Sequence, residues 1–125
     1  MPIPFYIINM QGCEDRWETT LKRLTSLHLN AERFEATIGK NLSEQEILKW
    51  YCPKKNKKRY NRNLSAGEIG CYVSHMRLWQ KMVDENIAYC VVLEDDLFIE
   101  ASLKDVVDAA LKLKNWDLIK LSERR

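Results

Sequence analysis

Apolar residues along the chain alternate between short continuous runs and stretches with helical spacing. Four runs predict strands, at residues 4–10, 31–36, 89–93 and 116–121. Apolar spacings of three and four, together with capping residues, predict helices at residues 14–27, 44–51, 66–83 and 102–113. Strands that alternate with helices predict an α/β fold whose mostly parallel sheet is covered on both faces.

The longest predicted helix has a defined start. Ser65 and Glu68 have the spacing of a capping box, as have Ser43 and Glu46 before the shorter helix. Glycines at 67 and 70 weaken a helix intrinsically, so we expect another backbone or a ligand close to its first turn. The predicted buried stripe of this helix consists of Ile69, Tyr72, Val73, Met76, Trp79 and Val83.

A basic run at 53–63 interrupts this pattern and predicts a solvated loop inside a single domain at 1–125. Its segment Lys54–Arg62 is a candidate for peripheral contact with a membrane surface or an anionic acceptor. Nucleic acid is not expected as a partner, because Tyr60 alone provides too little stacking surface and the net charge is only +2.

The apolar stretches and the cysteines indicate the cellular compartment and the kinds of cross-link to expect. No stretch approaches the roughly 18 apolar residues of a membrane helix, and the start lacks signal-peptide features, so we expect a cytoplasmic protein, peripheral at most to the inner membrane face. The four scattered cysteines predict no disulfide framework. We also expect no zinc site, since neither His28 nor His75 has a cysteine at ligand spacing.

The candidate chemistry lies where the third predicted strand ends, at Glu94, Asp95 and Asp96. Ligands of open α/β sheets bind beyond the carboxyl ends of strands, and three adjacent carboxylates repel one another unless a cation is present. Oxygen ligands suit Mg²⁺ or Mn²⁺. In an extended backbone Glu94 and Asp96 point the same way, which makes them the predicted metal ligands, with Asp95 pointing away. A solvated turn or a helix cap is the alternative interpretation.

Two further side chains are candidates for catalysis. Glu68 and His75 lie seven residues apart on one flank of the longest predicted helix. Glu68 has a structural role as the capping-box acid, and His75 is either a packed histidine or a group that faces the diphosphate or the metal. No residue of the chain is a convincing catalytic base, and the candidates for that role are His75, Glu68 and Asp95.

Several segments together resemble one enzyme family. Residues 64–75, followed by the acidic triplet after Leu93, look like glycosyltransferase family 25, which includes lipooligosaccharide and collagen galactosyltransferases. The first strand with Asp15 and Arg16 is similar to that family's first strand and loop, and the segments 33–36 and 116–121 also fit.

The resemblance implies a Rossmann-like, GT-A-type nucleotide-sugar-binding fold. It also implies that the triplet takes the role of a D-x-D motif, with Mn²⁺ or Mg²⁺ held by Glu94 and Asp96. The sugar nucleotide, with UDP-galactose as the expected donor, would contact Asn9, Arg16, Glu94 and Asp95. The implied acceptor is a lipooligosaccharide of lipopolysaccharide biosynthesis.

Two departures from the family pattern qualify these expectations. Ile38 stands where the family usually has an aspartate, which removes a possible nucleoside contact. Family members are also longer, so we expect a domain truncated at its C-terminal side, whose uncovered apolar surface leads to a homodimer. The alternative is a catalytically inactive remnant that binds a nucleotide or a partner protein.

Overall fold

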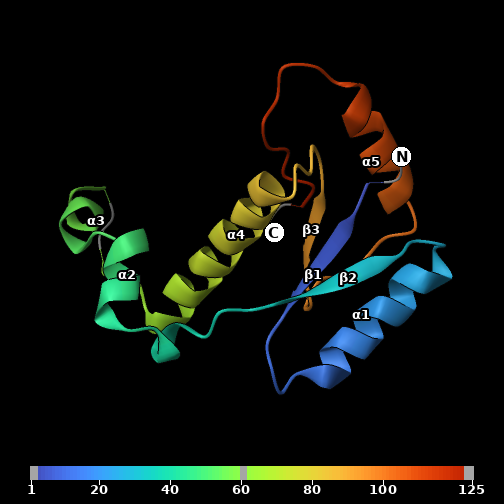
Figure 1. Ribbon diagram of the computed structural model, residues 1–125. Helices are drawn as coiled ribbons and strands as arrows, with labels where there is room; N and C mark the ends of the chain where they lie inside the picture. Colours follow the sequence, from blue (N-terminus) through green and yellow to red (C-terminus); the bar gives the residue numbers. More distant parts are fainter. Residues whose placement is uncertain (1–2, 60–61, 123–125) are drawn as a thin grey trace.

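The computed structural model describes residues 3–59 and 62–122 and contains a small parallel sheet (Figure 1). Its strands are β1 (Phe5–Asn9), β2 (Ala31–Glu35) and β3 (Val91–Glu94). The described strands lie in the order β2-β1-β3, and both pairings are parallel. The predicted α/β class with a parallel sheet is therefore confirmed.

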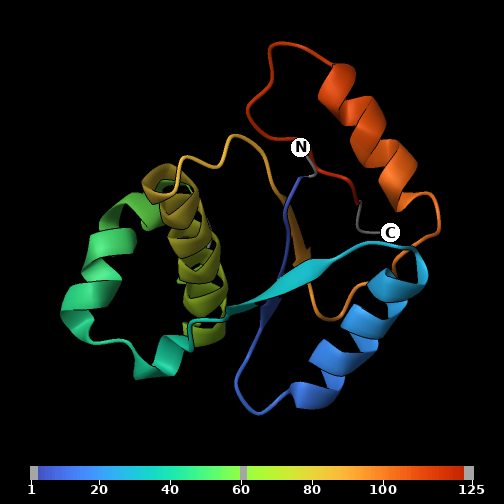
Figure 2. The ribbon, with the colours of Figure 1, turned by 45° about the vertical axis from the view of Figure 1, so that its right-hand side comes forward.

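Helices cover both faces of the sheet. α1 and α5 lie against one face and α4 lies against the other (Figures 1 and 2). Two short helices, α2 and α3, extend beyond α4 and away from the sheet (Figure 1). The bounds are α1 Glu14–Ser26, a 3-10 turn η1 Gly39–Asn41, α2 Glu44–Trp50, α3 Pro53–Arg59, α4 Ala66–Asp84 and α5 Leu103–Lys112.

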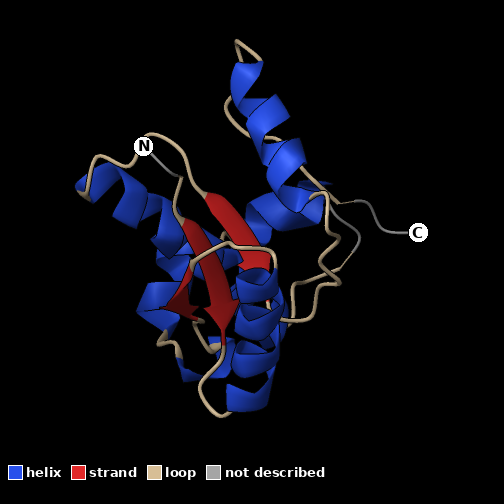
Figure 3. Cartoon of the chain, turned by 90° about the vertical axis from the view of Figure 1, so that its right-hand side faces the viewer, coloured by secondary structure: helices blue, strands red, loops and turns tan. Residues whose placement is uncertain are grey.

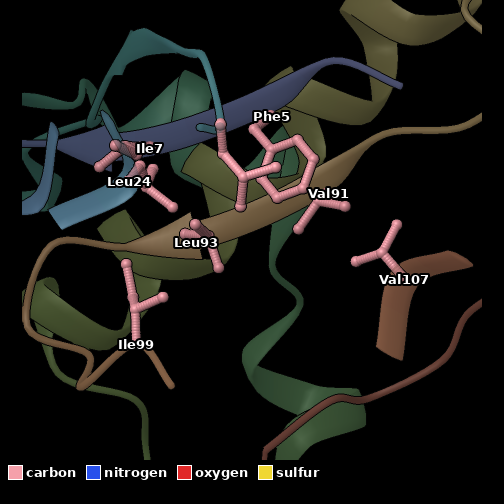
Figure 4. Packing of buried hydrophobic residues seen from close by; sticks show 8 residues of the cluster. Phe5, Ile7, Leu24, Val91, Leu93, Ile99 and Val107 are labelled. Carbon is pink, nitrogen blue, oxygen red and sulfur yellow. The ribbon is translucent and has the colours of Figure 1, made fainter. Parts of the chain in front are cut away.

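The central strand divides the core into two clusters, because its side chains alternate between the faces. Phe5 and Ile7 pack with residues of β3, α1 and α5, among them Leu24 and Val107 (Figure 4). The opposite face of β1 packs against α4 through Leu78. Every residue of β1 is buried, and burial of one such large apolar side chain stabilises the fold by roughly 2 kcal/mol.

The predicted apolar stripe of α4 is only partly buried. The helix buries Ile69, Gly70, Val73, Ser74 and Leu78, whereas Val83 is exposed. Tyr72 and Trp79 also retain large exposed fractions. The buried residues of α4 differ from the predicted stripe because α4 packs against the loop after β2 as well as against the sheet. The contact with the loop favours small residues.

The basic segment differs from its prediction. Residues 53–59 form α3 where the sequence predicted a loop, although none of the described residues of this helix is buried. Lysine and arginine favour helices almost as well as alanine, and Pro53 suits a first helical position. Helix formation here needs no apolar stripe, which explains the error. Tyr60 lies outside the described residues.

The strand predicted at 116–121 is wrong. This segment is irregular, and Leu118 is exposed. Trp116 is fixed instead by its side chain, whose ring lies 5.6 Å from that of Tyr89 and whose indole N–H donates to the carbonyl of Leu113 at 3.1 Å. An apolar run becomes a strand only when a neighbouring strand accepts its hydrogen bonds, and the described sheet ends at β3.

Candidate functional site

The side chains of Glu94 and Asp95, at the end of β3, lie on opposite faces of the sheet. Glu94, the last residue of β3, pairs in register with Ile8 and lies on the face covered by α4. Asp95 begins the following turn and lies on the face covered by α1. The two side chains diverge where the strand ends. Residues 95–96 form a turn, so the extended backbone from which the alignment of Glu94 with Asp96 was predicted stops at Glu94. Figure 3 shows the parallel strands and the helices on either side of them.

A buried asparagine holds Asp95 in place. Asn9, at the end of β1, is only 2% exposed, and its amide nitrogen donates to Asp95 Oδ2 at 2.7 Å and to the carbonyl of Cys13 at 2.9 Å. Its amide oxygen accepts a hydrogen bond from Arg33 Nε at 2.9 Å. The side chain thus joins all three strands of the described sheet to the loop that leads into α1.

α1 places an arginine beside Asp95. Arg16, in its first turn, places Nη1 at 3.8 Å from Asp95 Oδ1 and keeps most of its side chain exposed. Thr20, one turn later, donates to the Asp95 carbonyl at 3.4 Å. The positive end of the helix dipole and an accessible guanidinium therefore lie beside the strand ends, which is a favourable arrangement for an anion. The structure brings together Asn9, Arg16 and Asp95, which the family resemblance implied as contacts of one sugar nucleotide.

A second cluster lies on the opposite face, between α4 and β3. His75 Nε2 lies 3.3 Å from Glu94 Oε1, and Cys71 Sγ lies 3.8 Å from the same oxygen. Cys71 and His75 occupy positions i and i+4 of α4, which face the same way on a helix. Burial and then the Glu94 carboxylate raise the pKa of the Cys71 thiol, and the Asp96 charge adds to this shift. Negative charge is therefore concentrated here, with the exposed Asp96 close enough to contribute.

Glu68 has structural partners. It completes the predicted capping box with Ser65, and Arg62 donates to both of its carboxylate oxygens, at 2.6 and 3.0 Å. Hydrogen bonds from Arg62, then from Ser65, lower the pKa of this carboxyl to about 2. A carboxylate of that acidity is a weak base, and His75 is directed at Glu94 instead.

The loop after β2 holds α4 in position. An added Cβ on Gly70 would lie 2.6 Å from the Gly39 nitrogen and 2.7 Å from the Thr37 carbonyl oxygen. Ser74 Oγ accepts from the Thr37 N–H at 2.8 Å and donates to the Gly70 carbonyl at 2.7 Å. The predicted close approach is confirmed at Gly70, whereas an added Cβ on Gly67 meets only the Ser65 hydroxyl at 3.9 Å. This contact fixes Cys71 and His75 opposite the end of β3.

A solvent-open hollow lies beside this loop at the carboxyl ends of β1 and β2. Ile38, which replaces the aspartate of the family pattern, is part of its wall and supplies no hydrogen-bond acceptor from its side chain. The hollow is lined by Gln11, Glu35, Ala36, Thr37, Ile38, Asn41, Leu42, Glu46 and Arg77.

Comparison with known proteins decides the family. The sequence model of glycosyltransferase family 25, described as an LPS biosynthesis protein, matches residues 2–124. The chain belongs to glycosyltransferase family 25. The resemblance inferred from residues 64–75 and the acidic triplet is thereby confirmed.

Animal members of glycosyltransferase family 25 share this region. A family 25 member of Anopheles gambiae is 32% identical over 96% of this chain, and one of Aedes aegypti is 33% identical over the same share. Procollagen galactosyltransferase 1-A of Xenopus laevis is 30% identical. The chain spans only 21–22% of the length of these three relatives. No helix within 3–59 and 62–122 is long and apolar enough to cross a membrane.

The sequence analysis missed one cluster of side chains. The cluster of Cys71, His75 and Glu94 contradicts the expectation that no histidine has a cysteine at ligand spacing. The available signal was the four-residue interval between Cys71 and His75 on a strongly predicted helix. Glu94 could be added only once the face covered by α4 was known.

Proposed function

We propose that this family 25 chain forms the nucleotide-sugar-binding part of a GT-A-type galactosyltransferase that uses UDP-galactose. The observation that carries the proposal is the corner at the carboxyl ends of β1 and β3, where Asn9 and Arg16 meet Asp95. Diphosphate groups are recognised by such a combination of a helix N-terminus, an accessible arginine and a nearby cation.

The donor chemistry at the end of β3 suits Mn²⁺ or Mg²⁺. Glu94 and Asp96 would hold the ion, since Asp95 is engaged by Asn9 and both other carboxylates are accessible to solvent. Burial first, and then the charges of Glu94 and Asp96, raise the pKa of the nearby Cys71 thiol, and such a cation would neutralise those two charges. A bound divalent ion would stabilise charge that develops on the departing diphosphate.

The chain's own residues would orient the donor. Arg16 is placed to contact the phosphates, and the hollow beside Gln11 and Thr37 offers space for the nucleoside. Ile38 contributes apolar contact there and no hydrogen bond, so we expect nucleoside affinity to depend on the remaining polar groups. The assignment of the catalytic base to His75, Glu68 or Asp95 stays a prediction, and Glu68 is the weakest base of the three.

The family description and the names of the relatives indicate different acceptors. The family description refers to LPS biosynthesis, whereas several relatives are named for galactosyl transfer to procollagen. Galactose as the transferred sugar fits these relatives and the lipooligosaccharide acceptor inferred from the sequence. A homodimer and membrane contact through Lys54–Arg62 also stay predictions.

Calorimetric titration with UDP tests the metal assignment. We expect Mn²⁺ to strengthen UDP binding by the native chain, and we expect Asp96→Ala to weaken UDP binding in the presence of Mn²⁺ by about ten-fold or more, a loss of roughly 1.4 kcal/mol. The melting temperature should hardly change, because Asp96 is exposed.

Asp117→Ala is the matched control, since Asp117 is also an exposed aspartate but lies in the irregular C-terminal segment. It should bind UDP like the native chain. Equal Mn²⁺-dependent binding by Asp96→Ala and the native chain would refute the metal assignment. Failure of the native chain to bind UDP with Mn²⁺ would refute the nucleotide site itself.

A further inference from the structure

We infer that Cys71, His75 and Glu94 form a binding site for Zn²⁺ between α4 and β3. The site is defined by a thiol, an imidazole and a carboxylate, so it is chemically different from the oxygen-only site proposed above. The inference does not depend on transferase activity, because it concerns binding of the metal ion alone.

The distances suit one ion held by three side chains. Zinc binds cysteine sulfur at about 2.3 Å and histidine nitrogen or carboxylate oxygen at about 2.0–2.2 Å, so tetrahedral ligand atoms lie roughly 3.3–3.7 Å apart. His75 Nε2 and Glu94 Oε1 are 3.3 Å apart, and Cys71 Sγ and the same oxygen are 3.8 Å apart. All three ligand atoms lie within 4.8 Å of one another, so an ion fits with small side-chain movements.

The backbone that carries these ligands is rigid. Cys71 and His75 are one turn apart in the middle of a 19-residue helix, and Glu94 ends a paired strand. The close contact of Gly70 with Gly39 holds the helix against the loop after β2. A site built on regular elements is organised before the ion arrives, which reduces the entropy lost on binding.

The ligand set selects the metal. Thiolate and imidazole favour Zn²⁺ over Mg²⁺ and Mn²⁺, which prefer oxygen. Three protein ligands leave a fourth position for water or another ligand, and the exposed Cys71 makes that position accessible from solvent. Because zinc would take Glu94 Oε1, we expect Zn²⁺ to compete with Mn²⁺ for this shared carboxylate.

Titration of the reduced chain with Co²⁺ and Zn²⁺, without nucleotide, tests the inference. Cobalt in a tetrahedral site with a thiolate ligand gives a sulfur-to-metal charge-transfer absorption band. We expect this band in the native chain at one equivalent of Co²⁺ and its loss on addition of Zn²⁺. Cys71→Ser should remove the band, and both Cys71→Ser and His75→Ala should weaken Zn²⁺ binding by about ten-fold or more.

Three variants serve as controls. Cys52→Ser and His28→Asn change an exposed cysteine and an exposed histidine outside the cluster, and both should keep the band. Asp96→Ala should also keep it, since Asp96 is not one of the three ligands. Circular dichroism would establish that Cys71→Ser and His75→Ala are folded.

The outcomes separate the two metal proposals. A native chain without the cobalt band, or an unchanged band in folded Cys71→Ser, would overturn the zinc site and leave the UDP titration unaffected. Conversely, zinc binding by a chain that binds no UDP with Mn²⁺ would support the zinc site and refute the proposed function.

Discussion

Replacement of Gly70 with alanine is expected to lower the free energy of unfolding by about 3 kcal/mol, with a fall in melting temperature of roughly 10 °C. The new methyl group would lie 2.6 Å from the Gly39 nitrogen and 2.7 Å from the Thr37 carbonyl oxygen. Both neighbours are backbone atoms, so α4 or the loop after β2 must move as a whole. Urea unfolding of the variant and the native chain measures the difference.

Gly67→Ala is the matched control, because it changes the same residue type three positions earlier in α4. Its added methyl group meets only the Ser65 hydroxyl, at 3.9 Å. Alanine should therefore stabilise the helix by up to about 1 kcal/mol. A Gly70→Ala variant that melts as high as Gly67→Ala would show that the close approach is not structurally important.

Asn9→Asp is expected to cost about 3 kcal/mol of stability at neutral pH. The native amide donates to Asp95 Oδ2 and to the Cys13 carbonyl, and a carboxylate in its place would face two acceptors without a proton to share. The site is 2% exposed, so water cannot replace the lost donors. The strand ends that hold Asp95 should separate, and UDP binding should be lost with them.

The loss of stability in Asn9→Asp should depend on pH. Arg33 Nε, 2.9 Å from the oxygen on the other side, would lower the pKa of the introduced carboxyl, but Arg33 is exposed to solvent. Burial and the Asp95 carboxylate act on the buried side and would raise that pKa above its value in the unfolded chain, so the protonated form favours the fold. The Asn9→Asp variant should therefore recover stability in acid and lose it as the pH rises through that raised pKa.

Asn30→Asp places the same change on an exposed residue and should alter stability by no more than about 0.5 kcal/mol. Urea unfolding of both variants at acidic and neutral pH is the measurement. A pH profile for Asn9→Asp that matches that of Asn30→Asp would contradict the role given to the Asn9 amide.

Local patterns predicted the elements that local interactions stabilise. Both capping boxes form with the residues expected, Ser43 with Glu46 and Ser65 with Glu68. The parallel sheet followed from buried runs separated by amphipathic helices. The errors at α3 and at 116–121 have different causes. A solvated helix has no apolar stripe, and a strand depends on a partner that the apolar run itself does not specify.

The candidate site was predictable where it depends on strand ends. The family resemblance implied that Asn9 and Asp95 contact one sugar nucleotide, and parallel strands that end at the same edge of the sheet bring the two residues together. The placement of Cys71 beside Glu94 depends instead on which face α4 covers. The periodic pattern of α4 carries no information about which face of the sheet the helix covers.

The strand order has a consequence for folding during synthesis. β1, α1 and β2 leave the ribosome before β3, and their parallel pairing involves only neighbouring segments of the chain. The other edge of β1 must wait for β3, and the bond between Asn9 and Asp95 joins residues 86 positions apart. Non-local pairing of this kind is slow, and an unpaired apolar strand is prone to aggregate meanwhile. A nascent chain of this protein should therefore be a candidate for chaperone binding until residues 91–95 have emerged.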